Sequence, residues 1–326
     1  MEPVRWGILS TAAINAAVIP PLRASEASDV VAVASREQAR ADAYAAEWGI
    51  PRAHGAYDAL LDDPDVEAVY ISIPNDTHVE WSIRALEAGK HVLCEKPLTR
   101  DPAAATRAFD AADAAGRLLM EAFMYRHHPQ TLRIAELVRD GAVGEIGLVR
   151  ATFLSPIPEG DIRMFPELDG GALMDVGCYC VSGARLVAGE PVSVTARQRL
   201  SAGGVDVRLA GTLVFPGEVV AQIVCAFDLG FREGLEIVGT EGSLHVATPW
   251  TCREPAIEIG RGPETERIEL DDVDRYGLQG DNLSRAIRGL EEPLLGREDA
   301  LGQARAIAAL YRSAERDGAP VELTTV

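Results

Sequence analysis

The chain has 326 residues and a formal net charge of −19 at pH 7, with a hydrophobic fraction of 47%. This length and composition are those of an ordinary globular protein of two domains, and the acidic charge argues against nucleic acid and anionic membranes as partners. No apolar run reaches the roughly 18 residues that predict a membrane helix. The five cysteines include no C-x-x-C pair, so we expect a reduced, cytoplasmic protein without structural zinc.

Residues 4–9 predict a first strand, which a short turn joins to a helix. A dinucleotide-binding fold places its G-x-G-x-x-G motif in this turn. The glycine positions hold Ser10, Ala12 and Asn15, so the turn does not match the motif. Small residues still let a backbone approach a pyrophosphate at a helix N-terminus. The candidate cofactor-binding residues of this turn are Ser10, Thr11, Ala12 and Ile14.

The predicted second strand, residues 30–34, ends in Ser35 and Arg36, and Arg40 follows one helical turn later. A strictly NAD-dependent domain carries an acidic residue here to bind the adenosine ribose. A hydroxyl and a guanidinium suit a 2′-phosphate instead, which favours NADP. Glu37 leaves NAD possible as a second cofactor, and the arginines also fit an ordinary solvated turn.

Helices predicted over 40–48, 77–88 and 101–115 alternate with strands over 68–73, 91–94 and 118–120. Such alternation predicts a parallel sheet covered on both faces, with ligands bound beyond the carboxyl ends of the strands. Further candidate cofactor-binding residues lie at those ends: Ser72, Pro74, Asn75, His78, Glu95, Lys96 and Pro97.

Lys96 is unusual because the chain has only two lysines, Lys90 and Lys96, among 31 basic residues. A lysine ammonium changes its pKa readily when buried, whereas arginine stays charged. We therefore assign Lys96 a functional role, although a strand-end lysine can also be an ordinary surface charge.

The second half of the chain has a different pattern. A helix over 131–140 and a strand over 148–154 precede Gly170-Gly171, and a helix opened by these glycines would carry Asp175 and Tyr179 on one face. β-type segments follow over 205–215, 219–228, 235–238, 243–246 and 256–259, before helices over 281–290 and 298–317. We predict an α/β protein with a Rossmann-type domain, residues 1–122, and an α+β domain with a large, mainly antiparallel sheet, residues 123–326.

Three stretches together resemble the Gfo/Idh/MocA family of NAD(P)-dependent oxidoreductases. They are residues 7–14, Glu95-Lys96-Pro97, and Gly170-Gly171-x3-Asp175-x-Gly177-x-Tyr179. Tyrosine at the last position, and residues 121–130 with Arg126, resemble the branch that holds glucose-fructose oxidoreductase, dimeric dihydrodiol dehydrogenase and aldose 1-dehydrogenases such as D-xylose dehydrogenase. The resemblance implies a cofactor contact for Arg126.

It also implies hydride transfer between a nicotinamide and a sugar or polyol. The alcohol must lose a proton as the hydride leaves, so the step needs an acid/base group. Tyrosine, with a reference pKa of about 10, becomes a usable base beside an ammonium. We therefore predict that Tyr179 takes the proton, Lys96 tunes it and Asp175 orients the substrate. Pro97 would shape the turn, and Glu95 would place Lys96 or contact the nicotinamide ribose. Against this, an isolated helical Asp is often a cap and a helical Tyr is often packing.

The expected activity is NADP-preferring oxidation of an aldose at C1 to its lactone, with loop residues 155–169 and Tyr276 as candidates for recognising the sugar hydroxyls. Alternatives are a dihydrodiol dehydrogenase, a cofactor-binding regulator without turnover, and an NAD-dependent glycosidase. The resemblance and the apolar strand 219–227 imply sheets paired between subunits, as a homodimer or a dimer of dimers. His127 and His128 lack ligand partners at suitable spacing, so no metal is expected.

Overall fold

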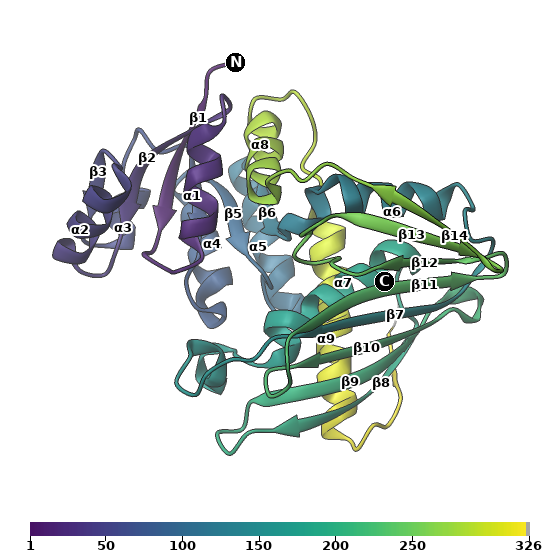
Figure 1. Cartoon of the computed structure of the whole chain (residues 1–326). Helices are drawn as coiled ribbons and strands as arrows, with labels where there is room; N and C mark the ends of the chain where they lie inside the picture. The colour runs from purple at the N-terminus through teal and green to yellow at the C-terminus, as the bar shows by residue number, and fades with distance from the viewer. Residues whose placement is uncertain (324–326) are drawn as a thin grey trace. The chain divides into compact units, whose positions relative to one another are not determined.

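The computed structural model describes residues 1–323, and the chain forms two compact units (Figure 1). Unit 1 comprises Met1–Met124 and Asp274–Leu301, and unit 2 comprises Tyr125–Val273 and Gly302–Val326. The segment 274–301, which the sequence analysis assigns to the second domain, thus belongs with the Rossmann-type unit. The reason is a helix in this segment that packs on the first helix of unit 1, as described below.

Unit 1 contains a six-stranded parallel sheet in the order β3-β2-β1-β4-β5-β6. Its strands are β1 (Val4–Leu9), β2 (Ser28–Ala34), β3 (Arg52–His54), β4 (Ala68–Ile71), β5 (His91–Glu95) and β6 (Leu119–Ala122). The central strands are buried almost throughout because helices cover both faces. The strand order reverses between β1 and β4, which is where such sheets bind ligands. The predicted Rossmann-type sheet is confirmed.

The helices that connect these strands are α1 (Asn15–Ala24), α2 (Gln38–Trp48), α3 (Tyr57–Leu61), α4 (His78–Glu87) and α5 (Pro102–Ala115). α5 shows how the local sequence sets its limits. The Asp101 side chain accepts a hydrogen bond from the amide of Ala103, Pro102 occupies the first turn, and Gly116 ends the helix with φ of 61°.

α8 (Arg275–Ile287) also belongs to unit 1, and it begins six residues earlier than the predicted helix over 281–290. Asp274 explains this start, because its carboxylate accepts hydrogen bonds from the amides of Tyr276 and Gly277 at 2.8 and 3.1 Å. A Cβ atom on Gly277 would lie 3.2 Å from Pro21 of α1, so the glycine allows the two helices to pack closely. Further along α8, Trp6 of β1 donates a hydrogen bond to Ser284 at 3.1 Å.

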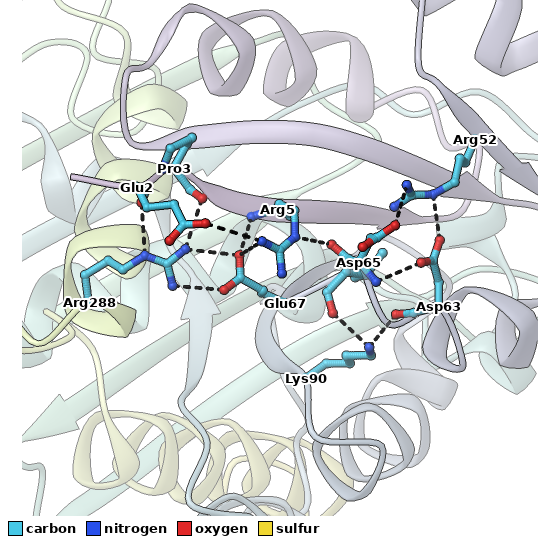
Figure 2. Close-up of polar contacts among 10 residues, drawn as sticks. Glu2, Pro3, Arg5, Arg52, Asp63, Asp65, Glu67, Lys90 and Arg288 are labelled. Atoms are coloured by element: carbon cyan, nitrogen blue, oxygen red, sulfur yellow. Dashed lines mark hydrogen bonds and ion pairs between the residues drawn. The ribbon is translucent and has the colours of Figure 1, made fainter.

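Arg288, just beyond α8, lies in the polar network that Figure 2 shows. Its guanidinium donates to both carboxylate oxygens of Glu67 at 3.0 Å, and to the carbonyls of Glu2 and Pro3 at 3.0 Å. Glu67 also accepts a hydrogen bond from the Arg5 amide. The network therefore fastens the end of α8 to the start of β1 and β4.

Figure 2 also shows Lys90, which lies beside Asp63. Its buried ammonium donates to the carbonyl oxygens of Asp63 and Val66 at 2.6 and 2.8 Å. Lys90 immediately precedes β5, whereas Lys96 immediately follows it. Of the two lysines in the chain, Lys90 is thus a structural brace at the amino ends of the strands.

Unit 2 is built on a nine-stranded sheet in the order β14-β13-β12-β11-β7-β10-β9-β8-β15. The strands are β7 (Ile146–Leu154), β8 (Ser193–Leu200), β9 (Asp206–Val214), β10 (Val220–Ala226), β11 (Arg232–Gly239), β12 (Ser243–Val246), β13 (Ala256–Arg261), β14 (Glu264–Glu269) and β15 (Val321–Glu322). All neighbours are antiparallel except β7 and β10. The predicted α+β arrangement is confirmed.

Unit 2 contains the helices α6 (Pro129–Arg139) and α7 (Cys178–Ala188), and from Gly302 on also α9 (Arg297–Glu315). In Figure 1, α7 and α9 lie along one face of the sheet. The opposite face carries a row of cross-strand polar neighbours, which we call the polar row: Gln222, Arg150, Glu236, His245, Glu258 and Arg267. Arg150 pairs with Glu236, and Arg267 with Glu258, both at 3.1 Å, so most charges of the row are paired within it.

Candidate functional site

The turn after β1 keeps a glycine-like backbone without glycine. Ser10 has φ of 147°, a conformation that residues with a side chain rarely adopt. Its hydroxyl donates to the carbonyl of Ser72 at 3.0 Å, Ser72 donates to the Asn15 side chain at 2.7 Å, and Asn15 donates back to the Ser10 carbonyl at 3.0 Å. This buried network joins the ends of β1 and β4. Ser72, a candidate cofactor residue, therefore stabilises the turn through its bonds to Ser10 and Asn15.

The same turn suits the pyrophosphate of a dinucleotide. α1 begins without a side-chain cap and without an acidic residue in its first turn, so nothing on the helix itself neutralises its positive end. Thr11, Ala12 and Ile14 are all partly exposed at this point. The residues present therefore fit the cofactor that a Rossmann-type unit implies.

The end of β2 offers positive charge. Ser35 is buried, with its amide bonded to the His54 carbonyl, whereas Arg36 and Arg40 are exposed. Tyr57 of α3 lies near both arginines: burial raises the pKa of its phenol, and the two guanidinium groups oppose that rise. Two cations and a phenol are donors that suit a phosphate group. Sequence patterns gave no sign of Tyr57, which is brought here only by the fold.

The sequence predicts that His78 contacts the cofactor, but its side chain lies in the interior of unit 1. The ring is completely buried, and its two nitrogens lie 2.9 Å from the carbonyl oxygens of Pro97 and Ile73. Burial lowers its pKa, and a neutral ring donates through one nitrogen at a time. His78 is therefore an interior brace between two loops. Pro74 and Asn75, which precede it, are partly exposed and remain candidates.

Glu95, Lys96 and Pro97 follow β5, and a cis peptide bond joins the last two. The Glu95 carboxylate is buried and accepts a hydrogen bond from the Tyr70 hydroxyl at 2.6 Å and one from the Lys96 amide at 3.2 Å. Glu95 thus fixes the backbone that carries Lys96. This geometry supports the role in placing Lys96, one of the two that the sequence left open for Glu95.

Tyr276, in the first turn of α8, lies near this strand end. Burial raises the pKa of its phenol, the Glu95 carboxylate raises it further, and Arg275 and Lys96 oppose these effects. The sequence offers no pattern that links residue 276 to residue 95. Tyr276, a sequence candidate for recognising sugar hydroxyls, thus has Glu95 and Lys96 as electrostatic neighbours.

Asp175 lies in a π-helical turn, Leu173–Gly177, that runs directly into α7, where Tyr179 is found. The start of this turn is held by Asp206 of β9, whose buried carboxylate accepts hydrogen bonds from the amide of Leu173 and the hydroxyl of Tyr311, both at 2.8 Å. The predicted helix is thus wider in its first turn than an ordinary α-helix. π-turns of this kind are frequent at functional sites.

Tyr179 is buried in a cluster of aromatic rings. Its ring centroid lies 5.4 Å from that of Phe153 in a T-shaped arrangement, 5.6 Å from Tyr125 and 6.2 Å from Trp250. These rings fix the orientation of Tyr179. Arg126, the remaining predicted cofactor residue, also belongs to unit 2, where it donates to Ser182 of α7 at 3.3 Å.

The predicted residues therefore form two groups. Lys96 and the other candidate cofactor residues, apart from Arg126, lie in unit 1, and Asp175 and Tyr179 lie in unit 2. Within residues 1–323, no cluster of His, Cys, Asp or Glu has the arrangement of a metal site. Over the same residues, no helix is both long and apolar enough to span a membrane.

Comparison with known proteins gives strong similarities over nearly the full chain. A D-xylose 1-dehydrogenase (NADP(+)) of Haloferax volcanii is 42% identical, over 98% of this chain and 99% of the relative. The crystal structure of an aldose-aldose oxidoreductase from Caulobacter crescentus, complexed with glycerol, superimposes with a TM-score of 0.92, 30% identity and coverage of 98% and 100%. A 3-ketoreductase from Actinomadura kijaniata, in complex with NADP and TDP-benzene, gives a TM-score of 0.90, 34% identity and coverage of 95% and 98%.

Two family models match in the order that the fold requires. Residues 4–123 match the oxidoreductase family with an NAD-binding Rossmann fold, and residues 131–245 match the GFO/IDH/MocA C-terminal domain. The relatives are dehydrogenases and reductases. The chain therefore belongs to the GFO/IDH/MocA family of oxidoreductases.

Proposed function

We propose that the protein is an NADP-preferring dehydrogenase that oxidises an aldose at C1 to the lactone. The observation that carries the proposal is the 42% identity, over 98% of the chain, to a relative named D-xylose 1-dehydrogenase (NADP(+)). The end of β2 supports the cofactor preference, because Ser35 and Arg36 stand where NAD-selective domains have an acid.

In this mechanism bound NADP would supply the acceptor for the hydride that C1 of the sugar loses, and the residues that would hold it are those of the turn after β1 and the end of β2. Tyr179 takes the hydroxyl proton as the hydride leaves. The Lys96 ammonium stabilises the phenolate and donates a hydrogen bond to the substrate oxygen. Asp175 accepts a hydrogen bond from a second sugar hydroxyl and so orients the ring. Glu95, held by Tyr70, keeps Lys96 in place.

The test is reduction of NADP⁺ and NAD⁺, followed by absorbance, with a panel of pentoses, hexoses, inositols and a dihydrodiol. We expect turnover of an aldose, faster with NADP⁺, and its loss in Tyr179→Phe. Tyr125→Phe is the matched control, since Tyr125 packs in the same aromatic cluster but donates its hydroxyl to Ser182 at 2.8 Å. If the protein binds NADP(H) tightly but no sugar reduces NADP⁺, the result would instead favour a regulator or a glycosidase.

Dihydrodiol oxidation is the second candidate, and the aromatic cluster favours it. Phe153 contacts both Tyr179 and Phe231, and Phe231 is 57% exposed. Exposed aromatic surface next to the proposed base suits a substrate with an apolar ring. A dihydrodiol that reacts with a higher kcat/KM than every aldose would reverse the order of the two candidates.

We also propose that the protein is a homodimer, or a dimer of dimers, paired through the open face of the unit 2 sheet. On this face, partly exposed Leu148, Val220 and Val238 flank the polar row. Because charges of the polar row are paired with one another, burying it leaves few charges without a partner. Light scattering should give a dimer or tetramer at micromolar concentration, and Arg150→Glu should weaken it.

All five cysteines are buried thiols in the described part of the chain, which supports a reducing, cytoplasmic location. Cell fractionation with antibody detection tests this assignment.

A further inference from the structure

Arg163 forms an ion pair with Asp175, the residue to which we assign substrate orientation. Its Nε lies 3.1 Å from Oδ2 of Asp175. The same guanidinium lies 3.0 and 3.3 Å from the two carboxylate oxygens of Asp161. The Asp175 side chain is 16% exposed and the Arg163 side chain 40% exposed. A single arginine therefore bridges a surface loop and the partly buried carboxylate.

The backbone around Arg163 is equally well fixed. Its amide donates to Oδ1 of Asp161 at 2.9 Å, which caps a short 3-10 turn, Ile162–Met164. Its carbonyl accepts a hydrogen bond from the Gly171 amide at 3.0 Å. At Gly170 a Cβ atom would clash with the Arg163 and Phe165 carbonyls, so only glycine permits this approach. The two glycines that open the Asp175 segment thus bring the loop of Arg163 against it.

The charges are complementary. Asp175 and Asp161 together raise the pKa of the Arg163 guanidinium, with Asp175 as the larger influence. The opposite charges strengthen the contact at Oδ2 of Asp175. A carboxylate whose Oδ2 is bonded to a fixed arginine also has a defined plane, which sets the direction in which it accepts a sugar hydroxyl.

We propose that Arg163 is a positioning residue for the sugar: its ion pair holds the Asp175 carboxylate in one orientation, and so determines the affinity for the substrate but not for the cofactor. This inference rests on the proposed function. The sequence points to loop residues 155–169 for sugar recognition but does not single out Arg163, because the Asp175 segment and the loop of Arg163 meet only in the folded unit.

The experiment compares wild type, Arg163→Met, Arg163→Lys, Asp175→Asn and the double variant Arg163→Met/Asp175→Asn. With the best aldose, Arg163→Met should raise KM about tenfold or more, as expected for loss of a charge-assisted contact. NADPH affinity, measured by fluorescence, should stay within about twofold. Arg163→Lys should raise KM less than Arg163→Met does, because lysine keeps the positive charge but lacks the planar guanidinium that contacts both carboxylates. The double variant should be no worse than Asp175→Asn alone, since both changes remove the same interaction.

Asp161→Asn is the matched control. It weakens the second ion pair of Arg163 but leaves the contact with Asp175, so KM should change by less than about threefold. An unchanged KM in Arg163→Met, or losses that simply add in the double variant, would overturn the inference while leaving the proposed function intact. A wild type that oxidises no aldose would overturn both.

Discussion

Replacing Arg288 by methionine should destabilise unit 1, because Arg288 fastens the end of α8 to the sheet. The substitution keeps the apolar stem and removes four hydrogen bonds, two to Glu67 and one each to the carbonyls of Glu2 and Pro3. The Arg288 and Glu67 side chains are 20% and 25% exposed, so the ion pair is neither a free surface pair nor a fully buried one.

The loss in the free energy of unfolding should lie between the values for an exposed ion pair and for a fully buried one. Exposed ion pairs contribute about 0–1 kcal/mol, and breaking a fully buried pair costs about 3–5 kcal/mol. Glu67 retains the Arg5 amide and guanidinium as partners, so the change does not strand a buried charge. We expect a loss of about 2 kcal/mol in the free energy of unfolding.

The loss should depend on pH. Burial raises the pKa of the Glu67 carboxyl, but hydrogen bonds from Arg288 and the Arg5 amide outweigh burial and hold the pKa below its ordinary value. A carboxyl with a lowered pKa in the folded state stabilises the protein above its unfolded pKa of about 4.3, and the contribution disappears as pH falls through the folded value. The difference between wild type and Arg288→Met should therefore be largest near neutral pH and shrink in acid.

Urea unfolding at pH 7 and pH 3.5, read by hydrogen exchange of the amides of β1 and β4, measures unit 1 alone. Arg107→Met is the control, since Arg107 is an exposed arginine on α5 of the same unit. A loss below about 0.5 kcal/mol at pH 7, or an equal loss at both pH values, would refute this account of the network.

Three further predictions test other parts of the molecule. Gly183→Ala should lower the free energy of unfolding in urea by about 1–3 kcal/mol, because its Cβ would lie 2.5 Å from the buried Trp250 ring. Gly147→Ala, with open space around its Cβ, should lower it by less than about 1 kcal/mol, and equal losses would contradict the packing argument. Arg36→Ala should raise KM for NADP⁺ about tenfold and leave KM for NAD⁺ nearly unchanged; equal changes would show that Arg36 does not read the 2′-phosphate. The five cysteines should react with a thiol reagent only after denaturation, because all are buried and burial raises the pKa of the Cys94, Cys180 and Cys225 thiols; rapid labelling of the native protein would contradict this.

The fold could be predicted where burial leaves a mark on the sequence. β1, β4 and β5 are buried on both faces, so they read as apolar runs, and Gly49 and Gly116 mark the ends of α2 and α5. β3 and β14 lie at sheet edges; β3 is a half-buried strand of three residues and β14 is polar and mainly exposed, so the sequence pattern does not predict them. These edge strands form hydrogen bonds with a neighbouring strand, and their own sequence does not indicate where that strand will lie.

The site shows the same division. Topology alone brings Ser10, Arg36 and Lys96 to the carboxyl ends of their strands, so their location could be inferred from the order of elements. The partners of these and the other site residues could not. The bond from Tyr70 to Glu95 and the ion pair of Arg163 with Asp175 join residues that only the completed fold makes neighbours. The burial of His78 between two carbonyls is likewise invisible in its sequence context.

The long separation between α8 and its partners has a consequence for biosynthesis. Trp6 and Ser284 are 278 positions apart, and Arg288 binds the carbonyls of Glu2 and Pro3. A ribosome adding about 5–20 residues per second needs roughly 7–30 s to make Tyr125–Val273 before α8 emerges. Throughout that interval the nascent chain displays the flank of α1 that α8 later covers. Residues 1–124 therefore complete their packing only after α8 has been synthesised, and the α1 surface next to Pro21 and Leu22 stays uncovered until then.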